Sequence, residues 1–424
     1  MALNLEQIRS QFPALSRPTI FLDNPGGTQI ARQSLEMIQN YLVECNANHG
    51  GVFPTSIESD RRVDEARLAM ADFLNAASPD EIVFGANMTT LTFHISRALA
   101  QEFSKGDTLV VTHLDHDANI SPWLRVAEDR GCRVRWVDFD PESGMLDLAD
   151  FQAALEEHPR LVAVGYASNA LGTINPLRKL ISMAHEAGAL VYVDAVQYAP
   201  HGPIDVQDLE CDFLVCSAYK FFGPHLGILY GRYDLLERLR AYRVRPAPAL
   251  PPGKFETGTG NFEGISGLLG ALNYLEWVGL TFGSEHAELF TEAFSGRRLI
   301  FKQAMSAIRA YEFELSRALL GALQSVSGIR LFGPSDPSRL DLRVPTFSFT
   351  LHGHSPRQVA QFMAEHSINV WDGNFYALAV TERLGLEESG GLVRVGAVHY
   401  NTLGEIEQFK DVLQKLVGCL SLVN

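Results

Sequence analysis

Short apolar runs alternate with amphipathic stretches through the first half of the chain. The runs with the character of β-strands are Glu81 to Phe84, Thr108 to Thr112, Val134 to Val137, Leu161 to Tyr166, Leu190 to Asp194, Phe213 to Cys216 and Gly227 to Tyr230. Between two of these runs, Leu180, Met183 and Ala184 recur at helical spacing, and Gly188 marks the end of the helix. Strands and helices in this order predict a mainly parallel α/β sheet of seven strands.

The second half of the chain changes character. A stretch rich in Pro and Gly, from Arg243 to Gly264, predicts an irregular loop, and helical patterns follow near Leu268 to Val278 and from Ser295 to Val326. Strand candidates at Thr346 to Thr350 and Leu392 to Val395 then predict a smaller α+β domain. We therefore expect a large domain at 21–285 and a small C-terminal α+β domain at 286–424.

The first residues predict a short amphipathic helix, because Leu5, Ile8 and Phe12 recur at helical spacing. We expect residues 1–20 to form a helical segment that packs on the small domain. The start of the chain lacks the basic flank and continuous apolar stretch of a secretory signal. No apolar run approaches the roughly 18 residues of a membrane span, so we expect a cytoplasmic protein.

Composition narrows the possible partners. The chain has 424 residues, of which 46% are hydrophobic, enough for a large core. Its net charge of -15 argues against general attraction to nucleic acid or to an anionic membrane, since both reward clustered Lys and Arg. The five cysteines, which include Cys419, form no Cys-x-x-Cys pair and predict reduced thiols, with no metal site.

Lys220 is the strongest candidate for chemistry. It lies in Ser217-Ala218-Tyr219-Lys220-Phe221-Phe222-Gly223-Pro224, directly after an apolar strand. Burial among these aromatic rings would favour the neutral amine, which is a nucleophile. Taken alone, a surface lysine whose stem lies on apolar neighbours is the more common case.

A second strand delivers polar groups to the same edge of the predicted sheet. Asp194 and Gln197 follow the run that ends in Val193, and ligands of open α/β sheets bind beyond the carboxyl ends of the strands. A lysine that can form a Schiff base and a carboxylate that can face a pyridine nitrogen are the groups required by pyridoxal 5′-phosphate (PLP). Asp194 alone could equally be a helix N-cap.

These motifs resemble the class V aminotransferase superfamily, and within it the cysteine desulfurase-like proteins. The resemblance runs over nearly the whole chain, from Phe21-Leu22-Asp23-Asn24 to Val398-His399-Tyr400-Asn401-Thr402, and its most specific segments surround Asp194 and Lys220. It implies a PLP-dependent transferase fold of type I, with PLP bound by the large domain.

The resemblance also implies roles for further residues. His116 matches the histidine that stacks on the pyridine ring, and Asn169 and Gln197 match amides that bond the 3-oxygen of the ring. The phosphate is expected at the helix that starts after Asn87, with contributions from Met88, Thr89, Ser217 and Tyr219. As isolated signals, Thr and Ser also cap helices, histidines near strand ends are often structural, and Asn169 could serve a turn.

Other implied residues concern the substrate and the partner chain. Arg394 matches the arginine that binds the substrate carboxylate, although an arginine on a strand is more often solvated or ion-paired. Asn24-Pro25-Gly26-Gly27 stands where desulfurases often carry small residues and threonine, so we expect Gly26 at a reshaped substrate entrance. Thr259 matches a threonine that touches the phosphate of the partner, so a homodimer is implied.

One segment departs from the desulfurases. They carry a mobile catalytic cysteine on the loop that corresponds to Val370-Trp371-Asp372-Gly373-Asn374-Phe375-Tyr376-Ala377, and here Tyr376 takes that position. Trp371 also stands where many of them have a further arginine. A phenol cannot accept sulfur as a thiolate does. Tyr376 could close the pocket or act as a catalytic acid or base.

We therefore expect a PLP-dependent enzyme that acts on a small amino acid through an external aldimine. A C–S lyase or an aminotransferase is favoured over a persulfide-forming desulfurase. The alternatives are an amino-acid racemase or epimerase, and a catalytically quiet scaffold that keeps the fold and binds a partner.

Overall fold

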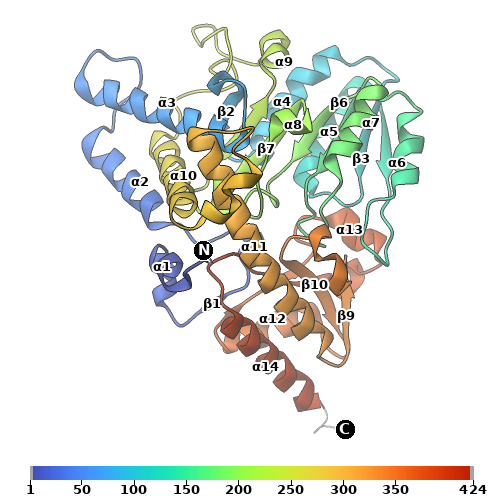
Figure 1. Ribbon diagram of the computed structural model, residues 1–424. Coiled ribbons are helices and arrows are strands. Elements are labelled where there is room, and N and C mark those ends of the chain that lie inside the picture. Colours follow the sequence, from blue (N-terminus) through green and yellow to red (C-terminus); the bar gives the residue numbers. More distant parts are fainter. Residues whose placement is uncertain (1–2, 421–424) are drawn as a thin grey trace.

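A seven-stranded, mostly parallel sheet forms the centre of the larger part of the molecule (Figure 1). The computed structural model describes residues 3–420, with side chains to residue 418. In sheet order the strands are β2 (Ile82–Gly85), β8 (Gly227–Gly231), β7 (Phe213–Ser217), β6 (Leu190–Asp194), β5 (Leu161–Gly165), β3 (Thr108–Thr112) and β4 (Arg133–Val137). Only β8 runs antiparallel to its neighbours within this sheet. The predicted α/β class and all seven predicted strands are confirmed.

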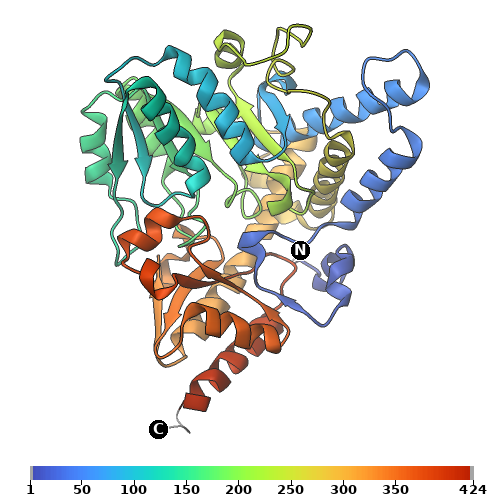
Figure 2. The ribbon, with the colours of Figure 1, turned by 180° about the vertical axis from the view of Figure 1, so that it is seen from behind.

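Alternate side chains of each strand enter two different cores, one on each face of the sheet. In β3, Leu109 and Val111 pack on one face, whereas Val110 packs on the other. Three helices cover the first face: α4 (Met88–Leu99), α5 (Ser121–Arg130) and α9 (Tyr233–Arg238). Figure 2 shows α4 and α5 from this side. The opposite face carries α3 (Pro54–Leu74), α6 (Leu148–Leu155), α7 (Leu177–Glu186), α8 (Val206–Leu209) and α10 (Phe262–Phe282).

The predicted helices of this part are present. Helix α7 ends just before Gly188, whose φ of 81° is a left-handed conformation that glycine adopts without strain. The Pro- and Gly-rich stretch contains no helix or strand from Arg243 to Asn261, as expected, but its last three residues, Phe262 to Gly264, belong to α10.

A smaller antiparallel sheet lies near the C-terminal end of the chain (Figure 1). Its strands, in order, are β12 (Trp371–Gly373), β13 (Leu392–Gly396), β10 (Thr346–Leu351) and β9 (Ile329–Phe332). The long helix α11 (Gly296–Gln324) reaches this sheet from α10, and two further helices share its core: α12 (Pro356–Glu365) and α14 (Leu403–Leu420). A short helix, α13 (Leu378–Arg383), follows β12.

The N-terminal segment joins both parts of the molecule. Helix α1 (Leu5–Ser10) places Arg9 within 2.9 Å of the Glu405 carboxylate at the start of α14, while the ring of Phe12 packs edge-on against Tyr274 of α10. After it, β1 (Ile20–Phe21) pairs with β11 (Ile368–Asn369), and α2 (Arg32–Glu44) packs on α10. The domain division remains a proposal, and the pairing of β1 places residues 20–21 beside the smaller part of the molecule.

Residues 3–420 lack two further features, a membrane-spanning helix and a cluster of metal ligands. No helix in this range is both long and apolar enough to cross a membrane. The same residues contain no group of three or more His, Cys, Asp or Glu side chains arranged to hold a metal ion. The free thiols there are Cys45, Cys132, Cys211 and Cys216, and the side chain of Cys419 lies outside the described residues.

Candidate functional site

A cavity opens at the carboxyl ends of the parallel strands, where the sequence predicted a ligand site. Strand β6 ends in Asp194, β7 ends in Ser217, and both residues line this cavity. Of the other predicted site residues, it brings together Met88, Thr89, His116, Asn169, Gln197, Tyr219 and Lys220. The remaining lining residues are Asn87, Asp115, Gly165, Ala167 and Val196.

Lys220 ends the short 3₁₀ helix η6 (Ala218–Lys220) that follows β7. Its Nζ donates a hydrogen bond to the Pro25 carbonyl and lies 5.0 Å from the centre of the Tyr219 ring. Burial, the largest cause, and the charge of Arg394 lower the pKa of Lys220 to about 7, whereas Asp194 opposes this shift. Near neutral pH, a substantial fraction of this amine therefore carries no proton.

The aromatic surroundings of Lys220 differ from the prediction. Phe221 stacks on Phe73, and Phe222 packs edge-on against the ring of His399. Both phenylalanines are fully buried in the core, because the turn at residues 218–222 directs them away from the cavity. Tyr219 brings an aromatic ring to 5.0 Å from Nζ, whereas Phe221 and Phe222 pack in the core, so the expectation of a lysine surrounded by rings was wrong for these two phenylalanines.

Two carboxyl groups lie buried at this end of the sheet. Asp194 accepts a hydrogen bond from the Val196 N–H, and burial raises its pKa to about 6. Asp115 accepts hydrogen bonds from the Thr112 hydroxyl and the Asn119 amide, and burial together with the charge of Asp194 raises its pKa to about 7. Burial therefore favours the neutral form of both acids, and it does so more strongly for Asp115 than for Asp194.

His116 begins a short 3₁₀ turn after β3, and its Nδ1 accepts a hydrogen bond from the Ala118 N–H at 2.9 Å. Burial, followed by the charges of Lys220 and Arg394, lowers the pKa of His116 to about 3. The imidazole is thus neutral, and because Nδ1 is the acceptor, its proton lies on Nε2.

Tyr376 does not line the cavity but lies against its wall. Its ring stacks on the imidazole of His116, and its carbonyl accepts a hydrogen bond from the Asp117 N–H at 2.7 Å. Tyr376 and the preceding Phe375 both have left-handed backbone angles, with φ of 57° and 58°. Two consecutive residues of this kind, neither of them glycine, store backbone strain, which is common in segments that act at sites.

The part of the cavity where we expect the phosphate of the cofactor lies at the start of α4. The side chain of Asn87 caps the helix by accepting from the Thr90 N–H, and the Ser217 hydroxyl accepts from the Met88 N–H at 3.3 Å. The Ser217 hydroxyl proton remains available to donate to an anion. Tyr219 lines the same cavity and stacks on His225, with ring centroids 4.9 Å apart.

Asn169 and Gln197 keep unused hydrogen-bonding capacity. Each amide nitrogen has a partner, the Phe375 carbonyl for Asn169 and the Thr346 hydroxyl for Gln197. Their side-chain oxygens are buried and have no partner in the described residues. Buried polar atoms are nearly always hydrogen-bonded in native proteins, so these two atoms indicate a ligand between them.

Arg394, on β13, lies just outside the cavity. Its Nη1 donates to the Asn169 carbonyl at 2.9 Å, and its guanidinium lies 4.2 Å from the centre of the Phe375 ring. The Nε atom is buried without a partner among the described residues. The edge formed by Nε and Nη2 is therefore free to receive both oxygens of a carboxylate.

Two predicted residues lie away from the cavity in this chain. Gly26 packs against Trp371, and a Cβ atom at Gly26 would overlap the indole ring. Thr259 is exposed on the loop before α10 and does not line the cavity. A role for Thr259 therefore requires a second chain.

Sequence reasoning missed three neighbours of the site. Asp115 precedes His116 at a strand end, which is a usable signal for a carboxylate in the cavity. Phe375 directly precedes Tyr376, but the sequence gives no separate signal for its role at the site. Asp23 has a buried oxygen without a partner in the described residues, and its charge interacts with Arg394, but no local pattern indicates that contact.

These features suit PLP. The cavity combines an amine of lowered pKa, a buried carboxylate, a neutral imidazole and amide oxygens that lack partners, and it lies at the N-terminus of α4, where an anion is favoured. The residues present therefore fit the cofactor that the sequence motifs imply.

Comparison with known proteins agrees with this chemistry. The chain matches the family described as aminotransferase class-V over residues 20–297 and 295–409. It is 34% identical over 424 residues to the aminotransferase-like protein FGM3 of Gibberella zeae, covering 98% of this chain and 99% of that protein. It is 31% identical over 436 residues to a cysteine desulfurase of Pectobacterium atrosepticum, covering 98% of both chains.

Solved structures show the same fold. The apo structure of a cysteine desulfurase from Thermococcus onnurineus NA1 superposes with a TM-score of 0.87 at 28% identity, covering 99% of this chain and 100% of that one. A cysteine desulfurase from Escherichia coli gives a TM-score of 0.82 at 26% identity, with 99% and 100% covered. The chain therefore belongs to the class V aminotransferase family, whose members are PLP-dependent transferases and lyases of fold type I.

Proposed function

We propose that this enzyme acts on a small α-amino acid by PLP-dependent chemistry at Cα, as a C–S lyase or an aminotransferase, without forming a persulfide on the protein. The observation that carries the proposal is a set of PLP-compatible residues in one cavity, with Tyr376 stacked against its wall on His116. The sequence resemblance supports it further, because it implies that Tyr376 replaces the desulfurase cysteine. The relatives named cysteine desulfurase support the type of substrate, and the loop argues against their sulfur acceptor.

The bound cofactor would supply an electron sink for bond cleavage at the substrate Cα. Lys220 would hold it covalently and, once released, its Nζ would take the proton from Cα. A pKa of about 7 suits this task, because the neutral amine is present at physiological pH and its protonated form is still a competent acid.

The other residues would position the reacting groups. The ionised carboxylate of Asp194 would face the pyridine nitrogen and keep its proton in place. Arg394 would orient the substrate by binding its carboxylate through the free Nε and Nη2 edge. His116, neutral and held by the Ala118 N–H, would cover one face of the ring and limit the access of water.

We further propose that the enzyme is a homodimer. Large apolar side chains are exposed on α2, α3 and the loop between them, namely Leu35, Leu42, Val43, Val52, Phe53 and Ile57. Exposed apolar patches of this kind favour a protein interface. The exposure of Thr259 supports the same proposal, because the threonine could then reach the cofactor of the partner. Light scattering of the purified protein would test it, with twice the chain mass expected.

The reaction type is tested with a panel of amino acids. Holoenzyme is incubated with each amino acid, and the 2-oxo acids, released sulfide and racemised substrate are quantified. We expect turnover of at least one small amino acid, and little protein-bound persulfide after incubation with cysteine. Abundant persulfide on any cysteine would refute the proposed reaction, and silence with every amino acid would favour a binding scaffold.

A further inference from the structure

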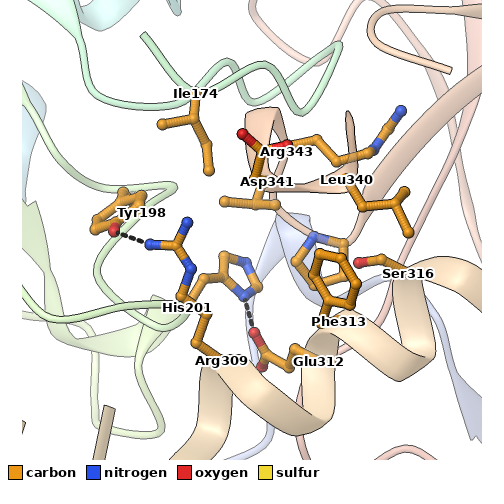
Figure 3. A pocket seen from close by; sticks show the side chains of 12 residues that line it. Ile174, Tyr198, His201, Arg309, Glu312, Phe313, Ser316, Leu340, Asp341 and Arg343 are labelled. Atoms are coloured by element: carbon orange, nitrogen blue, oxygen red, sulfur yellow. Dashed lines mark hydrogen bonds and ion pairs between the residues drawn. The ribbon is translucent and has the colours of Figure 1, made fainter. Parts of the chain in front are cut away.

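A second cavity, of about 130 Å³, lies between the two parts of the molecule (Figure 3). One wall comes from loops next to the large sheet, another from α11, and the third from the segment that leads into β10. The lining residues are Ile174, Tyr198, His201, Arg309, Glu312, Phe313, Ser316, Leu340, Asp341, Arg343, Val344 and Pro345. Tyr198 directly follows Gln197, so this cavity and the PLP cavity share one segment of the chain.

A buried hydrogen-bonded pair, His201 and Glu312, forms one side of this cavity. His201 Nδ1 lies 2.7 Å from Glu312 Oε2, and the two side chains are only 5% and 2% exposed. The other Glu312 oxygen accepts a hydrogen bond from the His399 N–H at 3.0 Å. Both carboxylate oxygens therefore have partners within the protein, and the charge of the nearby Arg309 also acts on this carboxylate.

Arg309 has spare hydrogen-bond donors. Its Nη1 donates to the Tyr198 hydroxyl at 2.9 Å, and its charge acts on the buried Glu312 carboxylate without a direct ion pair between the two side chains. Figure 3 shows the guanidinium rising from α11 between Tyr198 and Ile174, beside the open space of the cavity. A guanidinium carries five N–H groups, so most of them remain available to a carboxylate.

An acidic group and an apolar surface complete the cavity. Asp341 is exposed, and its pairing with the equally exposed Arg339 is long, at 3.6 Å. Ile174, Phe313 and Leu340 supply apolar side chains to the same lining. A cavity of about 150 Å³ holds benzene, with its six heavy atoms, so the volume here suits a molecule of about that size.

We propose that this cavity binds a small free α-amino acid as its zwitterion, at a site separate from the PLP cavity. Arg309 receives the carboxylate, Asp341 receives the ammonium group, and a short side chain lies against Ile174 and Phe313. The ligand size is that of alanine, which has the same number of heavy atoms as benzene.

Calorimetry on the holoenzyme tests this site with L-alanine and two truncated probes, propionate without the amine and ethylamine without the carboxylate. We expect saturable binding of L-alanine that weakens about tenfold or more in Arg309→Gln and in Asp341→Asn, since each removes one charged contact. Propionate should bind more weakly than alanine, and its affinity should not fall in Asp341→Asn. The affinity of ethylamine should not fall in Arg309→Gln.

Two further variants separate this site from the catalytic one. Arg317→Gln changes an exposed arginine on the same helix that pairs with Glu314, and it should bind alanine as the wild type does. Arg394→Gln changes the PLP cavity, and it should keep the binding that depends on Arg309. Three results would each overturn the proposal. Alanine binding could be lost in Arg394→Gln but unchanged in Arg309→Gln, its affinity could be equal in every variant, or the wild type could show no saturable binding.

Discussion

The ring of Tyr376 stacks on the imidazole of His116, with centroids 5.8 Å apart and planes inclined by 19°. The phenol is otherwise exposed, with 75% of the residue open to solvent, and its hydroxyl has no hydrogen-bond partner among the described residues. This geometry favours a role for Tyr376 as a ring that closes the site. It argues against a role in which the hydroxyl transfers protons.

Exchange of Tyr376 distinguishes these two roles. We expect Tyr376→Phe to retain kcat/KM within about twofold, because the stacked ring is preserved. Tyr376→Ala should lower kcat/KM by about three- to tenfold, the value of an aromatic pair. Steady-state kinetics across pH would check this, and a large loss in Tyr376→Phe with a changed alkaline limb would identify the phenol as an acid or base instead.

Arg394 should be sensitive even to exchange for lysine. Arg394→Lys keeps the charge but cannot bond the Asn169 carbonyl and both oxygens of a carboxylate together. We expect kcat/KM to fall by about 10- to 100-fold, mostly through KM, since about 1.5–3 kcal/mol resides in hydrogen bonds to charged groups.

The matched control for Arg394 is Arg383→Lys, because Arg383 pairs with Asp138 at the surface. It should leave the kinetics unchanged. Equal effects of the two exchanges would argue against a substrate contact of Arg394.

Lys220 should make the stability of the cofactor-free protein depend on pH. Its folded pKa is about 7, below the ordinary value of 10.5, so between these values the unfolded chain binds more protons and stability rises with pH. Lys220→Met removes this dependence. The gain in thermal midpoint of Lys220→Met over the wild type should therefore be larger at pH 7 than at pH 10.

Exchange of an exposed lysine, Lys105→Met, is the control for this comparison, and its difference from the wild type should not vary with pH in this way. A constant difference for Lys220→Met would mean that the amine is solvated in the folded protein.

Gly26 should tolerate no side chain while Trp371 is present. A Cβ atom at residue 26 would overlap the indole, and the neighbouring Pro25 carbonyl holds Lys220 Nζ. We expect Gly26→Ala to lower the thermal midpoint and to shift the tryptophan fluorescence. The double variant Gly26→Ala, Trp371→Ala should recover the midpoint relative to Trp371→Ala alone, and failure to recover it would show that the indole is not the obstacle.

The sequence predicts the large sheet well because each strand is a short apolar run followed by polar residues at a fixed edge. The same regularity predicted that Asp194, Ser217 and Lys220 lie close together, and all three line the cavity. The directions of Phe221 and Phe222 depend on the backbone of one turn, which has no sequence periodicity. The contact of Phe375 with Arg394 joins the loop after β12 to β13, and only the folded chain shows it.

The most direct test of the central claim is chemical trapping of the cofactor. Holoenzyme is reduced with borohydride and digested, and the peptides are mapped by mass spectrometry, with Lys220→Ala as the control. We predict a pyridoxyl group on Lys220 in the wild type and none in the variant. A modified lysine elsewhere, or no modified peptide in protein that contains PLP, would contradict the account.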